Sequence, residues 1–174
     1  MSRRNIVLVG FMGTGKTTVG RLLSEQTGMP LVDMDERIEE RAGKTINRIF
    51  AEEGEKAFRA LERQIARELS AQSGQVVSTG GGVVLDPDNI SDFEKTGLVV
   101  CLLASAKTIL ERVESDDTRP LLAGGKQEKI LRLLETRRPL YEAFGHKIDT
   151  EGATPESIAD QIIALYETNL EIGS

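Results

Sequence analysis

The sequence predicts a three-layer α/β/α fold, in which helices cover both faces of a central parallel sheet of about five strands. Two observations predict this class. Short apolar runs alternate with amphipathic helical segments along the whole chain. The run at residues 98–103, LVVCLL, is apolar throughout, which is typical of a strand buried on both faces. Because 174 residues suit one compact core, we expect a single domain spanning residues 1–174.

The predicted elements follow one another in the order that a parallel sheet requires. The first four strands are short apolar runs, the fifth is a short extended piece, and helical periodicity follows most of them. The long helical region is expected to break near Gly43 and Gly54, since glycine favours helix ends. Strands are predicted at residues 5–9, 31–32, 76–77, 98–103 and 147–149, and helical segments after Lys16, at 36–73, around 109–113, at about 128–144 and around 158–165.

One stretch between two predicted helices has no regular period. Residues 115–127 contain several aspartates, glycines and a proline, which is typical of a surface excursion. We therefore expect a mobile lid at about residues 113–126.

Charge and composition exclude several classes of function. A net charge of -6 repels polyanions, so we expect no nucleic-acid partner, although clustered arginines and backbone amides can still bind a small anion. The single Cys101 forms no internal disulfide, and one Cys with one His is too few for the usual zinc site. The apolar run at 6–9 is too short to span a membrane. We expect a cytoplasmic protein with no membrane partner.

Residues 10–17, GFMGTGKT, match the phosphate-binding pattern G-x-x-x-x-G-K-[ST]. The match follows a predicted strand and begins a helix, so its backbone N–H groups and the helix N-terminus can surround phosphate. Lys16 would then bridge the β- and γ-phosphates of a nucleotide, and the Thr17 hydroxyl would ligate Mg²⁺. The alternative is a glycine-rich turn with an exposed lysine.

Two carboxylates, Asp33 and Asp35, follow the second predicted strand, at the sheet edge where open α/β sheets bind ligands. One of them would hold Mg²⁺ through water, while the other would accept hydrogen bonds from a substrate hydroxyl or take its proton. The alternative is that Asp35 only caps the next helix.

Arginines and glycines supply a second group of candidates. Arg59, Glu62 and Arg63 share one side of a helix, for which an exposed row of ion pairs is the ordinary interpretation. The glycine triplet at 80–82 follows a buried strand, so it either lets a ligand approach the sheet closely or forms a plain flexible turn. Arg119 lies in the predicted lid.

Two adjacent arginines, Arg137 and Arg138, precede Pro139 at the end of a long predicted helix. Arginines on such segments can close over phosphate or grip a carboxylate with two hydrogen bonds.

Together these motifs resemble the shikimate kinase family, in the P-loop group related to nucleoside-monophosphate kinases. The resemblance covers almost the whole chain, and Thr17 stands where many relatives have serine, which preserves the hydroxyl. Arg137 is chosen because the family arginine stands two residues before the proline. Arg138 is the alternative if Pro139 distorts the helix. The motifs are residues 10–17, 33–35, 49–50 with 54–55, 58–59 with Glu62, 80–82, 119–122, Arg137 with 139–141, and 149–150.

The resemblance implies a P-loop kinase that uses ATP and Mg²⁺ to convert shikimate to shikimate 3-phosphate, on the way to chorismate and the aromatic amino acids. The chain would act as a monomer, with an acceptor-binding helical region at about 34–62. Asp35 as a true base is not required. The implied catalytic residues are Lys16, Asp35 and Arg119; the nucleotide would bind Gly13, Thr14, Gly15, Lys16, Thr17, Thr18, Arg112, Arg119 and Pro155; shikimate would bind Asp35, Arg59, Gly80, Gly81, Gly82 and Arg137; and Mg²⁺ would bind Thr17 and Asp33.

Two other functions compete with this one. A gluconate kinase or a nucleotide kinase would share the phosphate loop but would need a different acceptor site. A nucleotide-dependent switch would need a protein partner, and the sequence contains no guanine-reading N/T-K-x-D segment.

Overall fold

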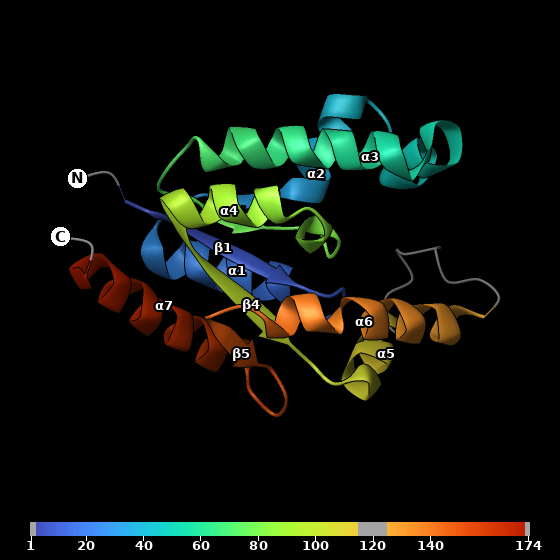
Figure 1. Cartoon of the computed structure of the whole chain (residues 1–174). Helices are drawn as coiled ribbons and strands as arrows, with labels where there is room; N and C mark the ends of the chain where they lie inside the picture. Colours follow the sequence, from blue (N-terminus) through green and yellow to red (C-terminus); the bar gives the residue numbers. More distant parts are fainter. Residues whose placement is uncertain (1–2, 115–124, 173–174) are drawn as a thin grey trace.

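The computed structural model describes residues 3–114 and 125–172, which contain a five-stranded sheet in the order β2-β3-β1-β4-β5. All neighbouring strands are parallel, which confirms the predicted fold class (Figure 1). The strands are β1 (Asn5–Gly10), β2 (Leu31–Asp33), β3 (Val76–Ser78), β4 (Gly97–Leu103) and β5 (Lys147–Asp149). The helices are α1 (Lys16–Thr27), α2 (Met34–Ala42), α3 (Ile46–Ser70), the 3-10 helix η1 (Val83–Leu85), α4 (Pro87–Thr96), α5 (Ala106–Glu114), α6 (Lys126–Glu142) and α7 (Pro155–Ile172).

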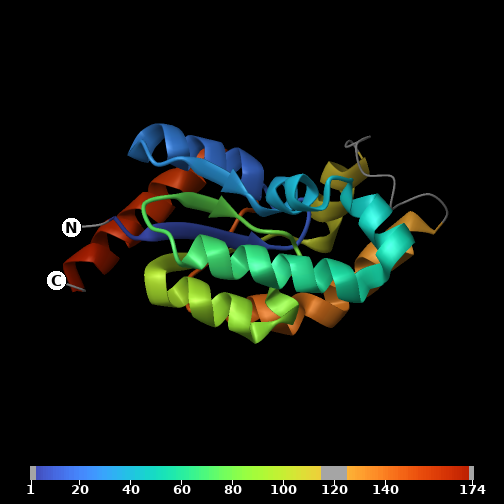
Figure 2. The ribbon, with the colours of Figure 1, turned by 90° about the horizontal axis from the view of Figure 1, so that it is seen from above.

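The central strands β1 and β4 are buried on both faces and separate two hydrophobic cores. Ile6 and Leu8 of β1 face the core that α1 and α7 cover, whereas Val7 and Val9 face the core beneath α3, α4 and α6. Figure 2 shows α1 and α7 on one side of the sheet and α3, α4 and α6 on the other. Because side chains alternate along a strand, the apolar runs predict this two-sided burial.

The long helical region is interrupted at both predicted glycines. Gly43 adopts a left-handed conformation (φ 66°) and ends α2. Gly54 (φ 84°, ψ 173°) kinks α3, so its first turns run in a different direction from the rest. Both breaks are confirmed, and α2 and α3 pack against each other.

Helix α4 is an element that the sequence analysis does not predict. Asp86 begins it by accepting a 3.0 Å hydrogen bond from the backbone N–H of Asp88, and Pro87 occupies its first turn. Phe93 is fully buried on its inner face. The sequence carries two signals for this helix, the Asp-Pro-Asp start and the apolar residues Ile90 and Phe93 spaced three apart.

Helix α6 begins slightly earlier than expected and contains Pro139 near its end. The predicted lid begins at the end of α5 and ends at the start of α6; its residues 115–124, with Arg119 among them, lie outside the described part of the chain. None of the helices within the described ranges is long and apolar enough to cross a membrane.

Candidate active site

The loop between β1 and α1 forms a cradle of backbone N–H groups. Gly13 and Gly15 both have positive φ (75° and 94°), a conformation that residues with a Cβ rarely adopt. No side chain caps the first turn of α1, so its N–H groups and the positive end of its dipole remain directed at the loop. The arrangement is suited to phosphate, as the motif predicts.

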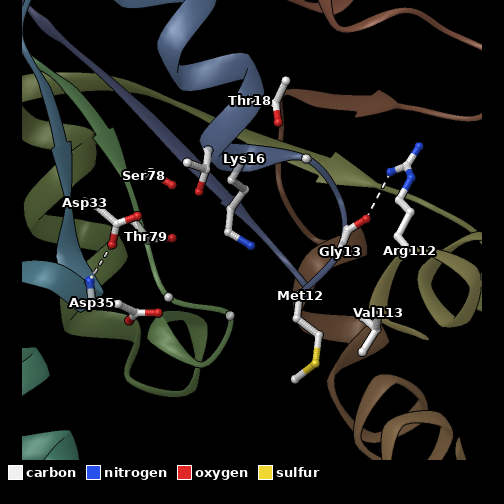
Figure 3. Close-up of a pocket in the computed structure, with 14 residues that line it drawn as sticks. Met12, Gly13, Lys16, Thr18, Asp33, Asp35, Ser78, Thr79, Arg112 and Val113 are labelled. Carbon is white, nitrogen blue, oxygen red and sulfur yellow. Dashed lines mark hydrogen bonds between the residues drawn. The ribbon is translucent and has the colours of Figure 1, made fainter. Parts of the chain in front are cut away.

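Lys16 lies over this loop. Its ammonium group donates hydrogen bonds to the backbone oxygens of Gly10 (2.6 Å) and Phe11 (2.9 Å). Figure 3 shows Lys16 between the two carboxylates of Asp33 and Asp35 on one side and Arg112 on the other. A pocket of about 220 Å³ joins these groups, and the exposed Thr17 also lines it.

A second pocket, of about 310 Å³, lies behind the phosphate loop, between α1, α5 and the start of α7. Thr18, Arg112 and Pro155 line it together with the loop residues Gly13, Thr14 and Gly15. Arg112 donates a 3.0 Å hydrogen bond to the Gly13 oxygen, so α5 is attached to the loop. The structure thus brings together the described residues expected to hold the nucleotide.

Asp33 and Asp35 both line the first pocket, but they differ in their roles at the helix start. Asp33 caps α2: its Oδ1 accepts hydrogen bonds from the backbone N–H groups of Asp35 (2.8 Å) and Glu36 (3.3 Å). The alternative that Asp35 is the cap is therefore wrong. Asp35 stands in the first turn of α2, with its carboxylate beside Gly80.

Glu62 of α3 is buried (2% exposed), and its Oε1 accepts a 2.7 Å hydrogen bond from Arg59. Burial raises the pKa of the Glu62 carboxyl group, and the nearby charge of Asp35 raises it further, while Arg59 and Arg137 oppose the shift. The interpretation that Glu62 belongs to an exposed row of ion pairs is therefore wrong. It is also wrong for Arg63, which binds Asp92 of α4 at 2.7 Å instead.

The glycine triplet packs directly against these charged groups. A Cβ on Gly80 would lie 2.8 Å from Asp35 Oδ1, and one on Gly82 would lie 2.5 Å from Arg59 Nη2. A side chain at either position would have to displace the end of the Asp35 or Arg59 side chain, so the interpretation as a plain flexible turn does not account for the triplet. A close approach to Asp35 and Arg59 does.

Arg137 and Arg138 lie on different sides of α6. Arg137 is buried (8% exposed) and its charge acts on both Glu62 and Tyr141. Arg138 is exposed and lines a separate pocket of about 270 Å³ at the ends of β4 and β5. The choice of Arg137 therefore places a cation in the cluster with Asp35, Arg59 and Glu62, and Arg138 would not.

Two features of this cluster are not predicted from the sequence. One is the burial of Glu62, for which the signal is its position four residues after Phe58 and three before Ile65, on the buried face of α3. The other is Tyr141, whose hydroxyl group donates a 2.6 Å hydrogen bond to the Gly81 oxygen. Its position four residues after Arg137 on one helix is a signal that could have linked the two.

A sequence model of the shikimate kinase family matches residues 12–167 of the chain. The chain belongs to the shikimate kinase family. It is 46% identical over 165 residues to a shikimate kinase from Thermodesulfovibrio yellowstonii, which covers 94% of this chain and 95% of the relative. A solved structure of shikimate kinase from Acinetobacter baumannii in complex with shikimate has a TM-score of 0.87 and 38% identity, covering 96% of this chain and 94% of the other.

More distant kinases share only the fold with this member of the shikimate kinase family. A gluconokinase from Sinorhizobium meliloti has a TM-score of 0.62 at 20% identity, covering 98% of this chain and 97% of that chain. The resemblance of the motifs to the shikimate kinase family is confirmed by relatives of much higher identity.

Proposed function

We propose that this chain transfers the γ-phosphoryl group of ATP to the 3-hydroxyl group of shikimate, forming shikimate 3-phosphate and ADP. The observation that carries the proposal is the placement of an acceptor cluster of both signs, Asp35, Arg59, Glu62 and Arg137, next to a phosphate loop. The family supports the same reaction. The product would enter the route to chorismate and the aromatic amino acids.

Shikimate has the chemistry that this cluster recognises. It carries one carboxylate and three ring hydroxyl groups, so it needs cations at one end and hydrogen-bond acceptors at the other. Arg59 and Arg137 would bind the carboxylate, while Asp35 would hold hydroxyl groups and orient the 3-hydroxyl toward the phosphate loop. The backbone of the triplet at 80–82 would lie against the ring, since the absence of side chains there lets Asp35 and Arg59 stand close to it.

The donor groups at the loop fit a magnesium ion that arrives with ATP. Thr17 offers a hydroxyl oxygen and Asp33 a carboxylate, and both line the pocket that Lys16 enters. These hard oxygen ligands suit Mg²⁺, which Thr17 would bind directly and Asp33 through water. When bound, the ion neutralises charge on the phosphate oxygens.

Catalysis by the protein's own residues would consist of alignment and charge neutralisation. Phosphoryl transfer proceeds through a loose transition state, so positioned cations contribute more than a strong base. Lys16 would neutralise charge on the transferring group, as would Arg119 from the lid expected at about 113–126. The proton of the 3-hydroxyl would leave to Asp35 or to solvent as the new P–O bond forms and the bond to ADP breaks.

An acceptor screen tests this proposal. ADP release is measured with a coupled assay at saturating ATP and Mg²⁺, using shikimate, gluconate and adenosine monophosphate as acceptors. Of the three acceptors, only shikimate is expected to be phosphorylated. Background turnover with shikimate alongside phosphorylation of gluconate would overturn the assignment, and nucleotide binding with no turnover of any acceptor would favour a switch.

The proposal also includes the oligomeric state and the compartment in which the enzyme works. We expect a cytoplasmic monomer, as the resemblance to the shikimate kinase family implies. Sedimentation of the protein at assay concentration checks this, and an activity that disappears on dilution would contradict it.

A further inference from the structure

Tyr141 is a buried residue of α6 that contacts three separate parts of the candidate site. Its side chain is 2% exposed, and burial raises the pKa of its hydroxyl group to about 12, so the group keeps its proton at neutral pH. That proton is donated to the backbone oxygen of Gly81 at 2.6 Å. The hydroxyl therefore fixes the backbone of Gly81, the middle residue of the glycine triplet, by a hydrogen bond.

The same hydroxyl oxygen also interacts with Arg137. Arg137 lies one helical turn earlier, and its hydrogen bond and positive charge both lower the pKa of Tyr141, against the larger effect of burial. A hydroxyl group can accept from one partner while it donates to another. Tyr141 thus connects the guanidinium expected to bind the acceptor's carboxylate with the backbone expected to lie against its ring.

The ring of Tyr141 reaches the phosphate loop. It packs edge-on against Phe11, with centroids 6.2 Å apart and planes at 77°. Gly81 also lies close to this loop, because a Cβ there would stand 3.4 Å from the Met12 nitrogen. The Tyr141 side chain therefore contacts Arg137, Gly81 and Phe11 of the phosphate loop.

We propose that Tyr141 is a positioning residue, which fixes Arg137 and the Gly81 backbone relative to each other and to the phosphate loop. The proposal rests on the proposed function for the identity of the acceptor. Phenylalanine at this position keeps the ring packing but leaves the Gly81 oxygen and an Arg137 N–H without their partner. Since Arg137 and Gly81 would contact the acceptor, losing these hydrogen bonds weakens acceptor binding more than nucleotide binding.

Steady-state kinetics of Tyr141→Phe test the proposal, at a temperature at which circular dichroism shows the variant to be folded. The KM for shikimate is expected to rise about tenfold and kcat to fall, while the KM for ATP stays within about twofold. A KM for ATP that rises as much as that for shikimate would indicate general loosening and would overturn the proposal.

The matched control is Tyr166→Phe. Tyr166 of α7 is also buried, and its hydroxyl donates a 2.7 Å hydrogen bond to the backbone oxygen of Arg4, at the opposite end of the strands from the site. This variant should lose similar thermal stability with both KM values unchanged. If the two variants alter the KM for shikimate equally, the effect of Tyr141 is only structural.

A double-variant cycle with Arg137→Lys adds a readout of the coupling. If Tyr141 acts through Arg137, the double variant raises the KM for shikimate by less than the product of the two single effects. Effects that multiply would refute the connection. Wild-type turnover of shikimate is measured alongside, because its absence would refute the proposed function, whereas normal turnover with an unaffected Tyr141→Phe variant would refute this inference alone.

Discussion

Gly82→Ala is a sharp probe of the acceptor site, because its effect follows from one contact. Gly82 has φ -89° and ψ 1°, which alanine also adopts, so the backbone does not resist the change. The added methyl group would stand 2.5 Å from Nη2 and 2.7 Å from Cζ of Arg59, far inside van der Waals contact. The guanidinium must therefore move.

The size of the effect follows from what Arg59 would lose. A hydrogen bond to a charged group contributes about 1.5–3 kcal/mol, and each 1.4 kcal/mol is about tenfold in affinity. We therefore expect the KM for shikimate to rise about 10- to 150-fold with the KM for ATP almost unchanged. Because the displaced atoms are the end of a flexible side chain, the melting temperature should fall by only about 2–4 °C.

The assay is the coupled measurement of ADP release with each substrate varied in turn. Gly145→Ala is the control, since its Cβ would meet no atom within 4 Å and its φ is not positive. Both KM values of the control should match the wild type. An unchanged KM for shikimate in Gly82→Ala would show that Arg59 does not bind the acceptor from its present position.

Three further predictions concern neighbouring groups. Because the pKa of Glu62 is raised in the folded protein by burial, its contribution to stability is present below the unfolded value of 4.5 and is lost as pH rises through the folded pKa. Glu62→Gln without ligands should therefore gain stability relative to wild type over that pH window, as followed by urea unfolding, and a constant difference between the two proteins would contradict the shift. Arg137→Lys should raise the KM for shikimate about tenfold or more, whereas Arg138→Lys, on the exposed side of α6, should not; equal effects would argue against the burial of Arg137 as the decisive feature. Hydrogen bonds from Ser105 and Thr108 at the start of α5 lower the pKa of Glu151, so Glu151→Gln should loosen the helix that carries Arg112 and raise the KM for ATP about threefold without changing that for shikimate.

The sequence predicts the sheet and the phosphate loop well, because both depend on local patterns. Apolar runs long enough to cross a buried sheet appear wherever a strand occurs, and the loop motif is continuous from residue 10 to residue 17. The breaks at Gly43 and Gly54 are likewise predicted from single residues with unusual backbone needs. Helix α4 is missed although the sequence marks it with an Asp-Pro-Asp start and with the apolar residues Ile90 and Phe93 spaced three apart.

The acceptor cluster is harder to predict because its geometry depends on contacts distant in the sequence. The spacing of Arg59, Glu62 and Arg63 is the same for a solvated row of charges and for the observed arrangement, in which Glu62 is buried and Arg63 reaches α4. For Glu62, its position four residues after Phe58 and three before Ile65 favours burial, whereas only the packing of α3 against α4 shows where Arg63 binds. The link from Tyr141 to Gly81 spans 60 residues and follows from the fold alone.

Four charged side chains lie around the glycine triplet: Arg59 and Arg137 carry positive charge, and Asp35 and Glu62 carry negative charge when ionised. Their net formal charge is then zero. Binding of a monoanion such as shikimate makes the net charge of this group -1, and binding of its phosphate ester makes it about -2 to -3. As the proposed acceptor site, these four residues should bind shikimate more firmly than shikimate 3-phosphate, which would favour product release once transfer is complete. Equilibrium dialysis should find the ester bound more weakly, and tighter retention would mean that the opposing charges do not cancel.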